Sequence, residues 1–383
     1  MSSYLDYNAT TPIDPRVLET MIEVYTKNPG NADSRTHTYG DDARKIVEDA
    51  RAKVAALIGV DSDEVFFTSG ATESNNIAIQ GLRDYAKQSG KKHIITTAIE
   101  HKAVLNTVMH MRDEGFDVDI LNPEEDGRIN PEDVIDHVRK DTLLISVQHV
   151  NNETGIIQPV QELGNYLHDK NVLFHVDATQ SCGKLVEEIR QIKYDMLAFS
   201  AHKFRGPQGI GALVLKRRRR VLPPIRPVFY GGQQEQGIRP GTTPVALVAG
   251  MGKACEIAGK EYRANAKNNK DIKEAILATL NKSGIKYMVN GDARKCIDST
   301  LNIYFDGVAS EALMLATKQY CAISNGSACT SKSYAPSYVL LAMGLPVDRV
   351  ENSVRISWGS GVDSIEVVRQ FQGIINAVKE LAV

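Results

Sequence analysis

The sequence predicts an α/β protein with a mainly parallel sheet, followed by a smaller α+β domain. Between residues 65 and 215, short β-branched runs alternate with helical stretches, as in sheets that are covered by helices on both faces. Several of these runs are apolar throughout, which strands buried on both faces require. After residue 245 the pattern changes to a long helix and a second, smaller set of elements.

The expected strands of the large sheet are, in order, VFFTS, HIITTAI, VDIL, TLLISVQHV, VLFHVDA, MLAFS and IGALVLK. Open α/β sheets bind ligands at the C-terminal ends of their strands, so we expect the chemistry in the loops there. A Pro/Gly-rich stretch after residue 220 predicts a long irregular loop up to residue 244. The later elements are a helix over 245–281, the run STLNIYF, a helix over 310–319, the run VRISWG and a final helix over 363–382.

This order of elements predicts three parts of the chain. We expect an N-terminal segment over residues 1–15, a large domain over residues 16–258 and a small domain over residues 259–383. The N-terminal segment is expected to pack with the small domain.

Composition excludes several classes of protein. The 383 residues carry 45 Lys and Arg against 47 Asp and Glu, a formal net charge of −2. This balance provides no global basic field for nucleic acid or anionic lipid, so we expect no direct nucleic-acid contact and no membrane association. No apolar run approaches the roughly 20 residues of a membrane span. The N-terminus reads as neither a secretory signal nor a transit peptide, which favours a cytoplasmic protein.

The cysteines are an odd number in a long chain and lack metal-ligand spacing, so we expect free thiols and no metal site. Cys329 lies in ISNGSACTSKSYAPS, a composition that predicts an exposed and mobile loop. Because burial cannot explain a thiol in such a loop, Cys329 is a candidate reactive residue. The others fall in ordinary helix, strand or turn settings and receive no role: Cys182, Cys255, Cys296 and Cys321.

The motif SGATES, residues 69–74, stands where the first expected strand ends and a helix begins. Free backbone N–H groups at that turn, with the hydroxyl of Thr72 beside them, predict a phosphate cradle. The alternative is that Ser69 or Thr72 is an ordinary helix cap.

Two further motifs, VDATQS and SAHKFRGPQGIG, place Asp177 and Lys203 26 residues apart, which is one β-α-β step. Such a pair is also typical of a surface ion pair. The neighbouring Gln180, Ser200 and His202 favour pyridoxal phosphate chemistry instead. In that chemistry a lysine forms the Schiff base, an aspartate keeps the pyridine nitrogen protonated, and hydroxyl and imidazole groups hold the phosphate.

Three more positions have both a functional and a structural interpretation. His101 opens a helix after HIITTAI, where its ring can stack on a planar cofactor or serve only the fold. In HVNNETG, the amides of Asn151 and Asn152 suit either a turn or a contact with cofactor or substrate, and spacing does not separate them. Arg355 in VRISWG suits a bidentate clamp on a substrate carboxylate or a structural salt bridge.

Together these motifs resemble the cysteine desulfurases of the class V pyridoxal-phosphate-dependent family, in the group typified by NifS and IscS (group I). The resemblance runs over essentially the whole chain, through YLDYNATTPIDPRV, FTSGATESNN, EHKAV, HVNNETG, HVDATQSCGKL, SAHKFRGPQGIGAL, RPGT, SNGSACTS and VRISWG. It implies the type I fold of pyridoxal-phosphate-dependent transferases, with a seven-stranded sheet. It also implies conversion of L-cysteine to L-alanine, with a persulfide left on the enzyme.

The resemblance implies a role for each matching residue. Lys203 holds pyridoxal 5′-phosphate, Asp177 partners the pyridine nitrogen, and His101 stacks on the ring and assists proton transfer. Cys329 is the nucleophile, and Arg355 binds the substrate carboxylate. The other implied contacts are Asn152 and Gln180 to polar groups of cofactor or substrate, Ala71, Thr72, Ser200 and His202 to the phosphate, and Thr242 of the partner subunit of a homodimer to the same phosphate.

The resemblance leaves the destination of the sulfur open. An acceptor protein in iron–sulfur cluster assembly, tRNA thiolation or DNA phosphorothioation would receive it. The alternatives are a selenocysteine lyase or another class V enzyme, and a partner-binding subunit with a vestigial cofactor site; the intact Lys203, Asp177 and His101 argue against the last. The chain departs from the family pattern at Ala201, Gln233, Pro240 and Asn325.

Overall fold

The computed structural model describes residues 3–326 and 336–382 of the chain. Within them, the large sheet has seven strands in the order β2-β8-β7-β6-β5-β3-β4, and only β8 runs antiparallel to its neighbours. Its strands are β2 (Val65–Thr68), β3 (His93–Thr97), β4 (Asp117–Leu121), β5 (Thr142–Gln148), β6 (Leu173–Asp177), β7 (Met196–Ser200) and β8 (Gly211–Leu215). The prediction of an α/β protein with a mainly parallel sheet is therefore confirmed.

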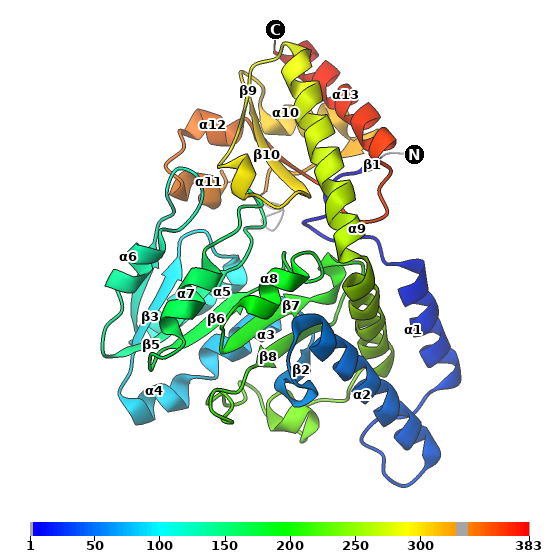
Figure 1. Ribbon diagram of the computed structural model, residues 1–383, viewed down its shortest axis with the longest axis vertical. Coiled ribbons are helices and arrows are strands. Elements are labelled where there is room, and N and C mark those ends of the chain that lie inside the picture. Colours follow the sequence, from blue (N-terminus) through cyan, green and yellow to red (C-terminus); the bar gives the residue numbers. More distant parts are fainter. Residues whose placement is uncertain (1–2, 327–335, 383) are drawn as a thin grey trace.

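Helices cover both faces of this sheet (Figure 1). One face packs against α2, α6, α7, α8 and the first half of α9, and the other packs against α3, α4 and α5. Every residue of β2, β3, β5, β7 and β8 is buried, which explains the continuous apolar runs, whereas the edge strand β4 is partly exposed. The helices up to this point in the chain are α1 (Pro15–Lys27), α2 (Thr38–Ile58), α3 (Ala71–Gln80), α4 (Arg83–Ser89), α5 (Lys102–Asp113), α6 (Pro131–Asp136), α7 (Val160–Leu167) and α8 (Val186–Gln191).

A second core lies around a three-stranded antiparallel sheet of order β12-β10-β9. The N-terminal β1 pairs in parallel with β11 beside it, and Leu5 is buried in this core. The predicted strands STLNIYF and VRISWG and the last helix are confirmed, whereas β1, β9 and β11 were not predicted because so few residues show no periodicity. The elements are β1 (Ser3–Tyr4), β9 (Tyr287–Val289), β10 (Thr300–Phe305), α10 (Ser310–Thr317), β11 (Cys321–Ala322), α11 (Tyr338–Ala342), α12 (Val347–Glu351), β12 (Ser353–Ser357) and α13 (Ser364–Leu381).

The helix α9 (Val245–Ser283) joins the two cores (Figure 1). Its buried residues from Val245 to Ala258 belong to the core of the large sheet, and those from Ile272 to Leu280 belong to the second core. The predicted boundary after residue 258 falls between these two stretches, although the three-part division itself stays a prediction.

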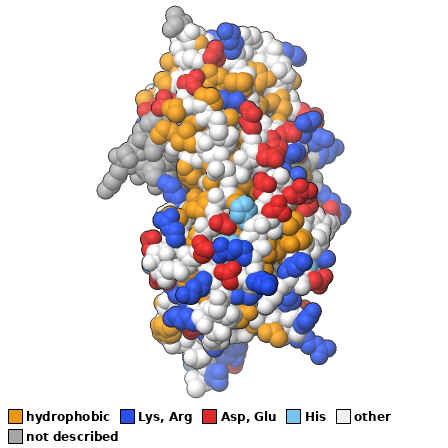
Figure 2. All heavy atoms as spheres, turned by 90° about the vertical axis from the view of Figure 1, so that its left-hand side faces the viewer, with side chains coloured by type: hydrophobic (Ala, Val, Ile, Leu, Met, Phe, Trp, Pro, Cys, Tyr) orange, Lys and Arg blue, Asp and Glu red, His pale blue; other side chains and the backbone are white. Residues whose placement is uncertain are grey.

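The surface matches the balanced composition. Figure 2 shows Lys and Arg side chains interspersed with Asp and Glu on one face of the molecule. Within the described part of the chain, no helix has both the length and the apolar character needed to cross a membrane.

Close contact between α2 and α9 positions the long helix against the large sheet. A Cβ added at Gly252 of α9 would lie 2.6 Å from the Cα and 2.7 Å from the Cβ of Ala50 on α2. Real side-chain atoms do not approach backbone so closely, so the absence of a side chain at Gly252 sets the distance between the two helices. Gly259 lies further along the same helix and is exposed, and there the nearest atom to such a Cβ is 3.7 Å away.

We expect the substitution Gly252→Ala to lower the free energy of unfolding by about 1–3 kcal/mol, because the added methyl overpacks the α2–α9 contact. The matched control Gly259→Ala should be neutral or stabilising by up to about 1 kcal/mol, because alanine favours the helix and meets no neighbour. Urea unfolding of both variants followed by circular dichroism measures the difference. Equal effects at the two positions would show that the contact does not limit the packing.

Candidate active site

The candidate active site lies at the carboxyl edge of the large sheet. The strands β5, β6 and β7 are parallel neighbours that end at Gln148, Asp177 and Ser200. Because the carboxyl ends of parallel strands meet at one edge, the loops that follow these strands converge there. The loops carry the predicted residues Asn152 and Lys203.

Lys203 ends a short 3₁₀ helix, η2 (Ala201–Lys203), directly after β7. Its Nζ donates hydrogen bonds to the backbone carbonyls of Asn8, at 2.6 Å, and Ala9, at 2.8 Å. The N-terminal segment therefore crosses the sheet edge and contacts the predicted cofactor lysine. These partners were not predicted, because a backbone carbonyl leaves no signature in a sequence.

Asn8 connects this lysine to the rest of the site. Its backbone N–H donates to Ser357 Oγ at 3.0 Å, and its Nδ2 donates to the Asn152 carbonyl at 3.1 Å and to Thr300 Oγ1 at 2.9 Å. Gln180 Nε2 donates to the Asn8 carbonyl at 2.9 Å. One buried asparagine thus links the edge of the large sheet to β10 and β12 of the second core, a role that the sequence did not reveal.

Asp177 is only 5% exposed and both of its carboxylate oxygens accept hydrogen bonds. Oδ2 accepts from Nδ2 of Asn75 on α3 at 2.7 Å, and Oδ1 accepts from the Thr179 N–H at 2.9 Å. These donors hold the carboxylate in one orientation. Two residues earlier, burial lowers the pKa of His175 to about 4, so this neighbouring ring stays neutral and does not pair with Asp177.

The residues of the predicted phosphate cradle lie at the start of α3. Gly70 precedes the helix with φ of 155°, and no side chain caps the helix there. The Ala71 N–H donates to Ser200 Oγ at 2.7 Å, so the structure brings these two predicted residues into direct contact. Thr72 follows at the second helical position and is exposed. A helix N-terminus that lies open beside a hydroxyl group suits an anion.

Two predicted histidines flank the site in neutral form. His101 caps α5, with its Nδ1 accepting from the Ala103 N–H at 3.1 Å, so the ring proton lies on Nε2. Burial lowers the pKa of His101, and the charge of Lys203 acts in the same direction while Asp177 opposes it. Burial, helped by Lys203, lowers the pKa of His202 to about 4, and its Nδ1 lies 3.0 Å from Thr10 Oγ1. Both rings are therefore uncharged at neutral pH.

Arg355 on β12 is 3% exposed and has one unused donor. Its Nη2 pairs with Asp6 Oδ1 at 2.6 Å, and its Nη1 donates to the Asn152 carbonyl at 2.9 Å. Among the described residues, neither Arg355 Nε nor Asn152 Oδ1 has a hydrogen-bond partner, although both atoms are buried. Buried polar atoms are rarely left unpaired, so this donor and this acceptor point to a ligand with a carboxylate and an amine.

Lys184 is a neighbour of the site that the sequence did not single out. Its Nζ donates to Gln180 Oε1 at 3.4 Å, and it lines the same cavity as Lys203. Burial, together with the charges of Lys203 and Arg355, lowers the pKa of Lys184 to about 7. A second amine therefore stands close to the predicted cofactor lysine.

Two predicted residues remain, Thr242 and Cys329. Thr242 is exposed, in the irregular loop that Arg239 ties to Glu73 of α3 at 2.9 Å. Cys329 lies outside the described residues.

Two of the departures from the family pattern, Gln233 and Ala201, are tolerated by the backbone. Gln233 has φ of −98°, a value that needs no glycine, and the left-handed positions in its loop are Glu235 and Gln236, with φ of 48° and 56°. The Glu235 carboxylate accepts from Arg51, at 2.7 and 2.8 Å, and from a backbone N–H, which offsets this strain. Ala201 is fully buried, and its φ is not in the left-handed region.

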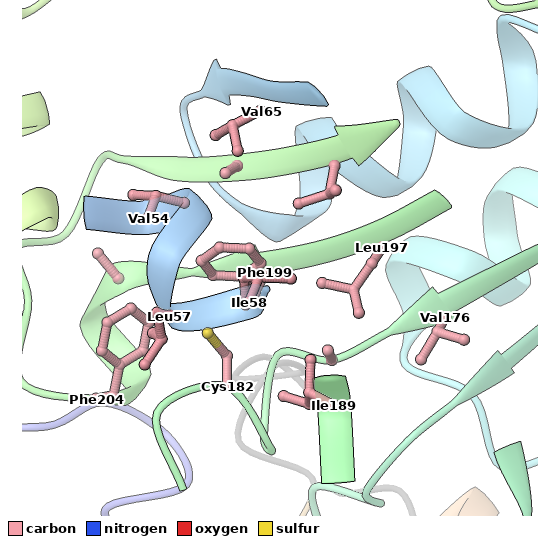
Figure 3. Close-up of a cluster of buried hydrophobic side chains, with 14 of the residues drawn as sticks. Val54, Leu57, Ile58, Val65, Val176, Cys182, Ile189, Leu197, Phe199 and Phe204 are labelled. Carbon is pink, nitrogen blue, oxygen red and sulfur yellow. The ribbon is translucent and has the colours of Figure 1, made fainter. Parts of the chain in front are cut away.

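The four cysteines within the described residues are all buried and free. Figure 3 shows Cys182 among apolar side chains that include Leu57, Ile58 and Ile189. Burial raises the pKa of all four thiols, so their thiolates are disfavoured and they serve packing. Across residues 3–326 and 336–382, no group of three or more His, Cys, Asp or Glu side chains is placed to hold a metal ion.

Comparisons with known proteins agree with this geometry. The family model "Aminotransferase class-V" matches residues 3–369. The chain is 43% identical to the cysteine desulfurase IscS of Pasteurella multocida over 380 residues, which cover 99% of this chain and 93% of that relative. Among solved structures, a NifS-like protein superposes with a TM-score of 0.91 at 34% identity, with both chains fully covered. DndA from Streptomyces lividans superposes with a TM-score of 0.81 at 42% identity, with 93% of this chain and 99% of DndA covered.

The family model spans nearly the whole chain, and the relatives are similar over almost their full length. The chain therefore belongs to the class V aminotransferase family and, within it, to the cysteine desulfurases.

Proposed function

We propose that the protein converts L-cysteine to L-alanine and holds the released sulfur as a persulfide on Cys329, with pyridoxal 5′-phosphate bound by Lys203 and Asp177. One observation carries the proposal: an amine, a buried carboxylate and an unsatisfied arginine donor converge at one edge of the sheet. This is the set of groups that amino-acid chemistry on pyridoxal phosphate requires.

The residues at this edge fit the cofactor. Lys203 offers an amine for covalent attachment, and the oriented Asp177 carboxylate suits a protonated ring nitrogen. The start of α3 offers an anion site beside Ser200, and a Cβ at Gly70 would meet only Ser200 Oγ, at 3.3 Å. Buried Thr179 Oγ1 lacks a partner among the described residues. When bound, pyridoxal phosphate supplies an electron sink that stabilises negative charge on the substrate α-carbon.

In this proposal Lys203 moves protons at the site and His101 assists it. The carbonyls of Asn8 and Ala9 orient the Lys203 amine, which suits it to carry a proton to or from the substrate. His101 has its Nδ1 committed to the helix N-terminus, so Nε2 is the atom that it offers. The lowered pKa of His101 keeps the ring neutral, so its Nε2–H assists as a hydrogen-bond donor while Lys203 carries the proton.

Arg355 accounts for recognition of the amino acid. Its Nε donor can bind the carboxylate of cysteine, and the Asn152 Oδ1 acceptor can bind the amine. Asp6 and the Asn152 carbonyl hold the guanidinium through its other nitrogens. The Arg355 side chain therefore loses little conformational entropy when the substrate binds.

The sulfur step assigned to Cys329 is balanced in atoms and electrons. The Cys329 thiolate attacks the substrate sulfur, so a new S–S bond forms while the substrate C–S bond breaks. The electron pair of the broken bond stays with the β-carbon, which takes up a proton and becomes the methyl group of alanine. An acceptor protein then takes the outer sulfur from Cys329. Iron–sulfur cluster assembly, tRNA thiolation and DNA phosphorothioation all remain as destinations.

We also propose that the enzyme is a homodimer in which Thr242 of the partner subunit completes the phosphate site. Support comes from the exposure of Thr242, which lies on the loop that the ion pair of Arg239 with Glu73 connects to α3. Exposed apolar side chains lie on this loop and on the outer face of α1, where isolated subunits would leave them in water. They are Phe229 and Tyr230 on the loop, and Leu18, Ile22 and Tyr25 on the helix.

Borohydride reduction of the loaded enzyme followed by peptide mapping should find a pyridoxyl adduct on Lys203. In Lys203→Ala the adduct should be lost, and turnover should fall by about 10³-fold or more, since general acid–base catalysis alone contributes roughly 10²–10⁴. The control Lys184→Ala removes the neighbouring amine and should keep the adduct at Lys203. An adduct at Lys184 in the natural sequence would contradict the assignment.

The substitution Cys329→Ser should keep the visible absorption of the cofactor and abolish sulfide release from cysteine, because a hydroxyl cannot accept the sulfur as a persulfide. Absorption spectra and a sulfide assay measure both quantities. Cys321→Ala is the matched control and should retain turnover, since that thiol is buried. Normal turnover in Cys329→Ser would refute the nucleophile.

Arg355→Lys should raise KM for cysteine by about 10- to 100-fold, since it removes a charged hydrogen bond worth roughly 1.5–3 kcal/mol, while kcat changes less. Steady-state kinetics with L-cysteine separate the two constants. Asp6→Asn serves as the control, because it weakens the ion pair and leaves the arginine in place. An equal rise of KM in Asp6→Asn would mean that Arg355 acts through the fold and not on the substrate.

A further inference from the structure

Glu153 is a buried carboxyl group at the edge of the site for which the mechanism has no use. It lies in the turn after β5 and is 2% exposed. The Asn151 side chain shapes this turn: its Oδ1 accepts from the Glu153 N–H at 2.8 Å and the Thr154 N–H at 2.9 Å, and its Nδ2 donates to the Ile99 carbonyl at 3.0 Å. The backbone of Glu153 is therefore fixed to the large sheet.

The Glu153 carboxyl group contacts residues on both sides of the segment that contains Cys329. Its Oε2 accepts a hydrogen bond from Ser337 Oγ at 2.5 Å. On the other side, a Cβ at Gly326 would lie 2.4 Å from the same oxygen, so the backbone there packs directly on the carboxyl group. Gly326 also has φ of 88°, which glycine adopts most readily. One carboxyl group thus joins two positions that are eleven residues apart in the sequence.

Each of these two positions is also fixed to its own element. Ser324 exchanges backbone hydrogen bonds with Arg355 on β12, at 3.1 and 2.5 Å, and its Oγ accepts from the Gly326 N–H at 3.1 Å. Ser337 caps α11, with its Oγ accepting from the Leu340 N–H at 3.1 Å. Glu153 therefore contacts one position that is tied to β12 and one that caps α11, beside the bonds from Arg355 to the Asn152 carbonyl and from Tyr338 to the Glu100 carbonyl.

Electrostatics make these contacts costly to lose. Burial raises the pKa of Glu153, while the hydrogen bond from Ser337 and the charges of Arg355 and Lys102 act in the opposite direction. If Ser337 moved away, a buried carboxyl oxygen would lose its hydrogen-bond donor. An unsatisfied buried polar atom lowers the stability of the folded state. The contact with Ser337 is therefore strongly favoured whenever the carboxyl group is buried.

We propose that Glu153 is a positioning residue that anchors Gly326 and Ser337, on either side of the segment containing Cys329, to the edge of the large sheet. This segment then starts and ends at fixed positions beside Asn152 and Arg355. The catalytic consequence rests on the proposed function of Cys329, whereas the anchoring does not. Holding Gly326 and Ser337 in place lowers the entropic cost of bringing the thiol to the substrate, which raises its effective concentration there.

The anchoring is tested without turnover, by the rate at which trypsin cleaves after Lys332 in the cofactor-loaded enzyme. Glu153→Ala and Ser337→Ala should each raise this rate by about tenfold, the factor expected for loss of one buried hydrogen bond. The double variant should be about as fast as Glu153→Ala alone, because that substitution already removes the contact with Ser337. Glu153→Gln keeps an oxygen that accepts from Ser337 and should restore most of the natural rate, which also guards against a variant that fails to fold.

The matched control is Glu64→Ala, which removes another buried glutamate, one that caps a turn far from the site. It should leave cleavage after Lys332 unchanged. If Glu153→Ala cleaves no faster than this control, or if the effects of Glu153→Ala and Ser337→Ala add, the anchor is refuted.

Steady-state kinetics then show whether the anchor serves catalysis. Glu153→Ala should lower kcat for sulfide release by about tenfold while KM for cysteine stays within about twofold, because Arg355 is intact. Faster cleavage together with normal kcat would refute the positioning role while leaving the physical anchor supported. Normal turnover in Cys329→Ser would refute the proposed nucleophile, and the cleavage rates would still decide the anchor independently.

Discussion

The active site depends on the N-terminal segment lying between the two cores. The backbone carbonyl of Asn8 accepts hydrogen bonds from Lys203 and Gln180, while its side chain and N–H bind Asn152, Thr300 and Ser357. These partners come from loops of the large sheet and from β10 and β12 of the second sheet. Because these bonds are buried or partly buried, a relative shift of the two sheets leaves polar groups unsatisfied. The position of Lys203 and the position of Arg355 are thereby coupled.

Charge is distributed unevenly over this junction. Burial keeps His101, His175 and His202 neutral, so the histidine rings contribute hydrogen bonds but no charge at neutral pH. The positive groups are Arg355 and the lysines, and Asp177 and Asp6 oppose them from fixed positions. A zwitterionic amino acid suits such a site, since its carboxylate and amine complement a buried arginine donor and a buried amide acceptor. In the proposed function, substrate recognition and cofactor binding thus use separate groups within one polar network.

Much of the fold could be predicted from the chain alone. The buried strands β7 and β8 are almost entirely apolar, and the alternation with helices is local, so a parallel sheet and its functional edge follow from pattern. The convergence of Asp177 and Lys203 also follows, because consecutive parallel strands end side by side. The short strands β1, β9 and β11 could not be predicted, since two or three residues carry no period and their pairing partners are remote.

What the sequence by itself determined is the set of reactive groups and the sheet edge on which most of them lie, because side-chain chemistry and strand order are properties of the chain. Only the tertiary structure decided which groups satisfy one another. The bonds from Lys203 to backbone carbonyls, the orientation of Asp177 by Asn75, and the contact of Glu153 with both Gly326 and Ser337 join residues that are distant in the chain. A hydrogen bond forms only when its donor and acceptor lie within a few tenths of an ångström of their preferred distance. Packing sets that distance, and no sequence pattern contains it.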